Sequence, residues 1–164
     1  MELQGSCYCG RVKFSAVSYT PYPYMRCYCS ICRKTGGGGG YAINIMAQAD
    51  TLKVEGQHYV GLHQARAENP DHPGEFKTST AKRHFCTRCG SALWVAHPEW
   101  PEWVYPFASA VDTPLPKPPE ILHIMLDFAA PWVTIPEGQD HQHFPRYPSE
   151  GILDWHKRHG LYQP

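Results

Sequence analysis

The seven cysteines of this chain fall into three close groups, and this grouping limits what the chain can fold into. The groups are a CxC pair, a CxCxxC triad and a CxxC pair, namely Cys7 and Cys9; Cys27, Cys29 and Cys32; and Cys86 and Cys89. Cysteines spaced in this way can present their sulfurs to one ion from a single tight turn, as they do in zinc sites. An odd number of cysteines cannot all form disulfides within one chain. The pattern therefore indicates metal binding.

Seven thiols divide most naturally into four and three. The two pairs predict a closed four-cysteine zinc site that joins residues 7–9 to residues 86–89. The triad would then hold a second zinc with one position open, which is typical of catalytic rather than structural zinc. Two alternatives stay open: a single structural zinc with three spare cysteines, or two structural zincs with the triad completed by a histidine.

Charge and hydropathy exclude several classes of partner. Lys plus Arg and Asp plus Glu both number 15, so the formal net charge is zero, and neither a nucleic acid nor an anionic membrane is indicated as a partner. The chain contains no apolar run near the roughly 20 residues of a membrane span, and its start has no signal-peptide pattern. We therefore expect a cytoplasmic protein whose partners are small molecules, with an oligomeric state that the sequence does not specify.

The strand-like segments are short and separated by turns, which predicts a mainly β fold in a single domain over residues 1–164. Apolar and polar residues alternate from Arg11 to Val17, as in a strand with one buried face. The 16 prolines and 14 glycines leave little room for long helices. Further strands are expected at residues 41–46, 52–55, 77–85, 91–95, 104–110 and 121–128, and a loop at residues 63–75.

The only helix that the pattern predicts lies at the C-terminus, over about residues 149–160, with Ser149 as its cap and Gly160 at its end. His156 and His159 are interpreted as residues on the surface of this helix. The segment before it, residues 131–148, contains Asp140-His141-Gln142-His143, which we interpret as an exposed polar loop rather than a metal site.

Three segments of the chain resemble the glutathione-dependent formaldehyde-activating enzyme family, which also includes centromere protein V. They read GSCYCGRVKF at residues 5–14, CYCSICRK at residues 27–34 and RHFCTRCGS at residues 83–91, so the resemblance covers about residues 5–110. It implies an Mss4-like fold of the β-tent type with two zinc ions. A structural zinc would be held by Cys7, Cys9, Cys86 and Cys89, and a catalytic zinc by Cys27, Cys29 and Cys32.

This chain departs from the family pattern at one position. The middle motif of the family commonly reads CHCxxC, whereas Tyr28 stands here between the first two sulfurs. That position is not among the implied ligands, so the predicted metal site is unaffected. Lys82 and Arg83, just before the last motif, are similar to a basic residue of the family but are equally typical of a strand surface.

A zinc ion with three thiolate ligands carries a net negative charge, so it acidifies a bound water poorly and suits a soft sulfur ligand better. A thiol cosubstrate such as glutathione would attack an aldehyde, or its adduct would be cleaved, which is carbon–sulfur lyase chemistry. Arg33 and Lys34 are candidates to balance this charge or to bind the carboxylates of the thiol. The competing hypothesis is a non-enzymatic zinc-binding module or a metal or redox sensor.

Overall fold

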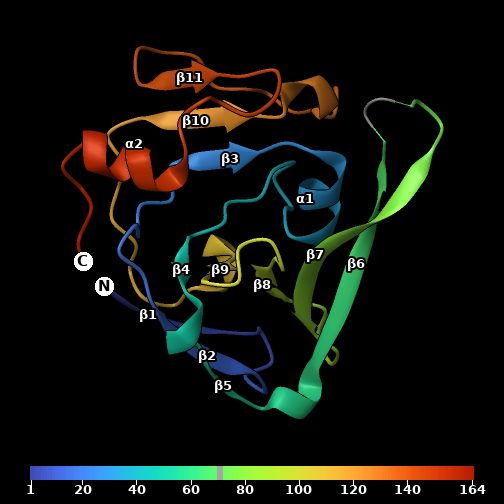
Figure 1. The fold of residues 1–164 in the computed structure, drawn as a ribbon, viewed down its shortest axis with the longest axis vertical. Helices are drawn as coiled ribbons and strands as arrows, with labels where there is room; N and C mark the ends of the chain where they lie inside the picture. Colours follow the sequence, from blue (N-terminus) through green and yellow to red (C-terminus); the bar gives the residue numbers. More distant parts are fainter. Residues whose placement is uncertain (70–71) are drawn as a thin grey trace.

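The computed structural model describes residues 1–69 and 72–164, and β-strands dominate it (Figure 1). One antiparallel sheet has the order β1-β2-β5, and a second, of five antiparallel strands, has the order β4-β9-β8-β7-β6. The third sheet is parallel, with the order β11-β10-β3. The strands span Glu2–Ser6 (β1), Lys13–Val17 (β2), Met25–Cys27 (β3), Ala47–Gln48 (β4), Lys53–Glu55 (β5), Val60–Glu68 (β6), Phe76–Cys86 (β7), Ala92–Ala96 (β8), Trp103–Pro106 (β9), Ile121–Ile124 (β10) and His141–His143 (β11).

The helices are short, as the glycine and proline content predicts. The C-terminal helix α2 (Ile152–Arg158) confirms the predicted helix. Its N-cap residue is Gly151 rather than Ser149, so no side chain caps its first turn. The sequence analysis missed the six-residue helix α1 (Ser30–Thr35), because it is too short to show a periodic pattern. Four 3-10 turns complete the set: η1 (Ala49–Thr51), η2 (Gln57–Tyr59), η3 (Ala108–Ala110) and η4 (Leu126–Phe128). Across the described ranges, no helix is both long and apolar enough to cross a membrane.

Four segments differ from their predicted structure. The strands predicted at residues 104–110 and 121–128 end early, at Pro106 and Ile124, and the 3-10 turns η3 and η4 follow them. The loop predicted at residues 63–75 is wrong for residues 63–68, which continue β6 and pair with β7; residues 70–71 lie outside the described residues. Most side chains of β6 are exposed, so the strand lacks the alternation that marks a buried face. Figure 1 shows the β6–β7 hairpin extending from the rest of the molecule. Residues 41–46 make isolated bridges through Ala42, Asn44 and Met46 instead of a strand.

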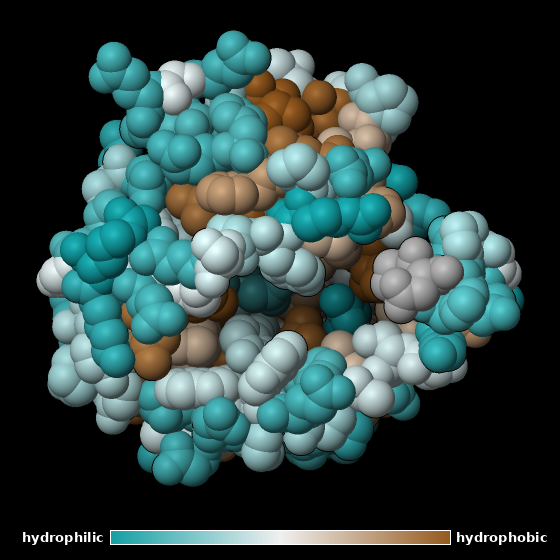
Figure 2. Space-filling view, turned by 45° about the horizontal axis from the view of Figure 1, so that its top comes forward, coloured by the Kyte–Doolittle hydropathy of each residue, from teal (hydrophilic) through white to brown (hydrophobic). Residues whose placement is uncertain are grey.

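The core has two parts. The larger one lies between the antiparallel sheets and includes Leu3, Phe14, Leu93 and Phe107. The smaller one joins α2 to the parallel sheet, where the ring of Trp155 stacks on Tyr24 at a centroid distance of 3.7 Å. Outside the core the surface is mainly hydrophilic in the view of Figure 2, with a hollow near its centre.

The smaller core corrects the interpretation of His156. This side chain is fully buried, with Nδ1 bonded to the carbonyl oxygen of Ile152 at 2.8 Å and Nε2 accepting from the Tyr22 amide at 3.3 Å. His159 keeps partial exposure and bonds Glu120 at 3.0 Å. The expectation that His156 lies on the helix surface is therefore wrong, because the segment around Tyr22 covers that face of α2.

The interpretation of residues 140–143 as an exposed loop is also wrong, because His141 and His143 belong to β11. His141 is half-buried, and its Nδ1 lies 2.8 Å from Nε2 of the buried His123. On the other side of the same ring, His123 Nδ1 bonds the Tyr28 hydroxyl at 2.8 Å. A hydrogen-bonded chain thus runs from the middle cysteine motif through the parallel sheet, and it accounts for the tyrosine that stands between the first two sulfurs.

Tyr28→Phe should lower the free energy of unfolding by about 1–3 kcal/mol, because it removes the partner of a buried ring nitrogen of His123. The control is Tyr8→Phe, since the side chain of Tyr8 is 96% exposed. Urea denaturation of the zinc-loaded variants measures both effects. Equal stability of Tyr28→Phe and the wild type would contradict a structural role for the hydroxyl.

Stability should also depend on pH through His123. Burial, followed by the nearby His143, Arg26 and His141, lowers the pKa of His123 to about 4. Because this folded-state pKa lies below the unfolded value, stability due to neutral His123 is present above about pH 6.5 and is lost as the pH falls toward 4. Urea denaturation at pH 7 and pH 5 should therefore show a larger loss for the wild type than for His123→Gln. Equal losses would contradict this assignment, and an NMR titration of His123 gives the pKa directly.

Candidate metal centres

The first centre is formed by the two cysteine pairs, which lie far apart in the sequence. Cys7 follows β1 and Cys86 ends β7, and both are buried, whereas Cys9 and Cys89 are exposed. All four sulfur atoms lie within 4.8 Å of one another, with 3.5 Å between the Sγ atoms of Cys7 and Cys9. The structure thus brings together the four cysteines that the sequence analysis assigned to one site.

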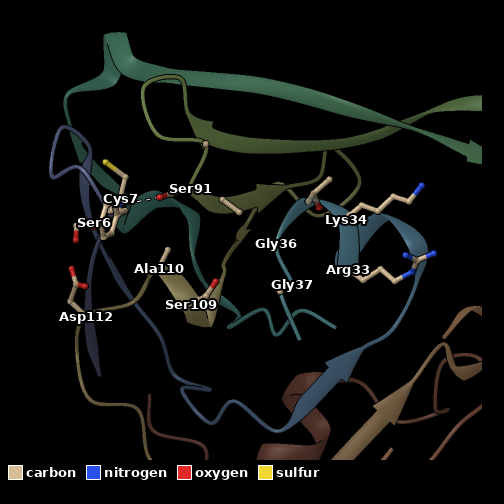
Figure 3. A pocket seen from close by; sticks show the side chains of 15 residues that line it. Ser6, Cys7, Arg33, Lys34, Gly36, Gly37, Ser91, Ser109, Ala110 and Asp112 are labelled. Carbon is tan, nitrogen blue, oxygen red and sulfur yellow. Dashed lines mark hydrogen bonds between the residues drawn. The ribbon is translucent and has the colours of Figure 1, made fainter. Parts of the chain in front are cut away.

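Tight turns orient these sulfurs. Gly10 and Gly90 follow the two pairs with φ of 72° and 75°, a backbone conformation that favours glycine. Backbone amides donate to the sulfurs: the Val12 amide to Cys7 at 3.2 Å and the Arg88 amide to Cys86 at 3.4 Å. The hydroxyl of Ser91, which also accepts from the Tyr8 amide, lowers the pKa of Cys89 to about 6 (Figure 3). The pKa values of Cys7 and Cys89 are thus lowered, which favours the thiolate form that binds zinc. The pKa of Cys9 is raised to about 11, because the neighbouring sulfurs outweigh the hydrogen bond from the Arg11 amide.

The second centre lies where β3 runs into α1. Cys27 ends β3, Cys29 caps α1 and Cys32 lies in the helix, with its amide 3.3 Å from the sulfur of Cys29. The three sulfurs lie within 4.8 Å of one another. Within the described parts of the chain, no histidine, aspartate or glutamate ligand atom lies that close to all three. The alternative in which a histidine completes the triad therefore has no support in the structure.

The pKa values of the triad cysteines shift in opposite directions. Hydrogen bonds from Cys27 and Cys32 lower the pKa of Cys29 to about 2, whereas its contacts with Cys29 and Cys32, together with burial, raise the pKa of Cys27. Three neighbouring sulfurs therefore cannot all ionise together unless a cation offsets their repulsion. A set of three thiolates with no fourth ligand among the described residues fits a zinc ion that keeps one position open.

Arg33 and Lys34 lie in the last turn of α1, where Arg33 is half-buried and Lys34 is exposed. Both line a cavity of about 720 Å³ that extends to Cys7, Ser91 and Asp112 (Figure 3). Their side chains extend from α1 away from the end of the cavity where Cys7 lies. The cavity therefore adjoins the first centre, and the cysteines of the triad are not among the residues that line it.

The glycine run at residues 36–40 has a packing role. A Cβ atom on Gly37 would lie 1.8 Å from the backbone oxygen of Tyr41, and one on Gly40 would lie 2.3 Å from a methyl carbon of Val133. Gly40 also has a φ of 87°. The run thus lets the chain turn closely behind α1, which accounts for at least part of its glycine content without a ligand.

This chain is a mainly β protein with two cysteine clusters that could each hold a zinc ion. The family model described as glutathione-dependent formaldehyde-activating enzyme matches residues 2–126, and the chain belongs to this family. It is similar to a Halomonas elongata protein named "Putative glutathione-dependent formaldehyde-activating enzyme", with 53% identity over 161 residues and 98% coverage of each chain. It is also similar to the crystal structure of a Rhodobacter sphaeroides protein, with 28% identity, a TM-score of 0.51, and coverage of 71% of this chain and 92% of that one.

Gly37→Ala should lower the free energy of unfolding by about 1–3 kcal/mol, because the added methyl group forces apart the backbone between residues 37 and 41. Gly38→Ala is the matched control, since a Cβ atom there meets nothing within 4 Å. It should change stability by no more than about 0.5 kcal/mol. Thermal unfolding of the two variants checks this difference, and equal shifts would contradict the packing role of Gly37.

Proposed function

We propose that this protein is a zinc-dependent enzyme of the carbon–sulfur lyase type that forms or cleaves the adduct of glutathione with formaldehyde or another small aldehyde. The observation that carries the proposal is the group of three cysteine sulfurs with no fourth protein ligand among the described residues. Membership of the family and the name of the Halomonas elongata relative support the same substrates. The cysteines are all free, which suits a reducing compartment, and we propose the cytoplasm.

The two centres have different roles in this proposal. Cys7, Cys9, Cys86 and Cys89 hold a structural zinc, which joins the start of the chain to the end of β7. Cys27, Cys29 and Cys32 hold a catalytic zinc, which supplies an open coordination position that favours the thiolate form of an incoming thiol. Their own negative charge makes activation of water a poor use of the site, so a hydrolase is disfavoured.

The reaction joins a thiol sulfur to the carbonyl carbon of the aldehyde. The thiol loses its proton and its sulfur forms the C–S bond as the π electrons of the carbonyl move to its oxygen. The oxygen then takes up a proton, and the product is a hemithioacetal. In the reverse direction, the oxygen loses the proton, the C–S bond breaks, and thiol and aldehyde are released. The protein contributes the position of the sulfur and positive charge near it.

Arg33 and Lys34 are proposed to contribute that positive charge and to meet the carboxylates of the thiol. Arg33 follows Cys32 directly, and its buried Nε has no hydrogen-bond partner in the parts of the chain that the structure describes. Lys34 is exposed, so its charge is screened by solvent. The structure thus offers more support for Arg33 than for Lys34.

Metal analysis of the wild type and of Cys29→Ser tests the roles of the centres. The wild type should bind one zinc at each cluster, and Cys29→Ser should lose the second zinc and the activity while it keeps its fold. Cys86→Ser is the contrast, because this buried side chain belongs to both the first centre and the core and its loss should prevent folding. Unfolding of Cys29→Ser would instead favour a purely structural triad.

Glutathione should change the visible spectrum of the cobalt-substituted wild type, since a sulfur ligand would enter the open position. Turnover should be measured by NMR exchange between free and thiol-bound formaldehyde, above the rate without protein, because the two combine without a catalyst. A protein that gives neither response would contradict the proposed enzyme and favour the zinc-binding module or sensor.

A further inference from the structure

Arg83 carries buried hydrogen-bond donors that nothing in the described chain uses. Its Nε and Nη1 atoms are both buried without a hydrogen-bond partner, and the ion pairs of the described residues do not include it. Buried charged donors are almost always paired in folded proteins, because an unpaired one loses its interaction with water without replacement. These donors therefore point to an acceptor that does not belong to the described chain.

The strand that carries Arg83 directs it toward the triad. Successive side chains of a strand point to opposite faces, and Lys82 and His84 line a cavity on one face of β7. Arg83 consequently points to the other face, where α1 lies. The hydrogen bond with Cys27 lowers the pKa of Cys32, but the hydrogen bond with Cys29 and burial raise it to about 11, and the positive charge of Arg83 opposes this rise.

Tyr147, in the C-terminal segment, interacts electrostatically with both the triad and Arg83. The negative charges of the three triad cysteines raise the pKa of its phenol, and the positive charge of Arg83 opposes this effect. Arg83, Tyr147 and the triad therefore lie within electrostatic reach of one another. The side chain of Tyr147 is 69% exposed, so this location is open to solvent.

The acceptor is not one of the triad sulfurs, because no hydrogen bond joins them to the buried Nε or Nη1 of Arg83. An incoming thiolate would add a further negative charge beside three sulfur ligands, and a second anionic group on the same molecule would be repelled unless a cation met it. A guanidinium group with open donors is suited to a carboxylate in that position.

We propose that Arg83 is a specificity-determining residue that binds a carboxylate of the thiol cosubstrate, so that the triad selects thiols with a carboxylate within reach of Arg83. The inference rests on the proposed function and deepens it, because it assigns recognition of a carboxylate of the thiol to a particular residue. It adds a second arginine to Arg33 as a candidate for this contact.

A pair of matched thiols tests the inference on the intact wild-type protein. N-acetylcysteinylglycine and N-acetylcysteine methylamide differ only by the glycine carboxylate, which lies at the same distance from the sulfur as in glutathione. Their dissociation constants can be measured from the visible spectrum of the cobalt-substituted protein. The wild type should bind N-acetylcysteinylglycine about 10-fold to 100-fold more tightly, as expected for a charge-assisted hydrogen bond. Equal affinities would overturn the inference and leave the proposed function in place.

Variants then assign the selectivity to Arg83. Arg83→Gln should remove most of the preference for N-acetylcysteinylglycine and change the affinity for N-acetylcysteine methylamide by no more than about twofold. Arg83→Lys should keep part of the preference, since it retains the charge and loses the planar fork. Lys82→Gln is the matched control, with the same charge removed from the opposite face of the same strand, and it should retain the full preference.

Each remaining outcome has a definite meaning. Equal weakening of both thiols in Arg83→Gln would overturn the inference, because Arg83 would then only balance the charge of the sulfurs. A wild-type spectrum that no thiol changes would overturn the proposed function as well. Circular dichroism and metal content of each variant establish that it is folded and loaded, and the wild-type comparison stands even if a variant does not fold.

Discussion

The contact between two distant cysteine turns is the constraint on which the rest of the structure depends. The turn after β1 and the turn after β7 meet with all four sulfurs inside 4.8 Å, and such sulfurs repel one another as thiolates unless a cation lies between them. Two of these cysteines, Cys7 and Cys86, also belong to the larger core. A metal ion bound there would therefore link the two antiparallel sheets at the point where their cores join.

The triad depends on that core for its position. Helix α1 has six residues, so it is too short to be stable without tertiary contacts. It is supported by its cap at Cys29 and by the glycine run, in which Gly36 packs against the ring of Phe107. On the other side, the hydrogen bonds from Tyr28 through His123 to His141 anchor the end of β3 to β10 and β11. The sulfurs are thus presented from a backbone that is held on both sides.

Sequence patterns predicted several strands, most clearly β2, in which buried side chains alternate with more exposed ones. The strands near residues 11–17, 77–85 and 91–95 were found close to their expected bounds, and the mainly β class was confirmed. The predictions failed where the burial of a side chain depends on segments that are distant in the sequence. Residues 63–68 form a strand exposed along most of its length, and His156 and His141 are covered by the segment around Tyr22 and by β10. When a remote segment buries a polar residue, the local sequence shows no periodic pattern, and the burial cannot be predicted from it.

The sequence by itself determined the sulfur donors and their local grouping, because ligand spacing within a turn is a local property of the backbone. It also indicated how the groups would divide into four and three. Only the tertiary structure decided that the two pairs meet, that no described histidine joins the triad, and that Arg83 has buried donors without a partner among the described residues. The reason is that contacts between segments far apart in the chain are selected by packing of the whole core, which the spacing of residues along one segment does not encode.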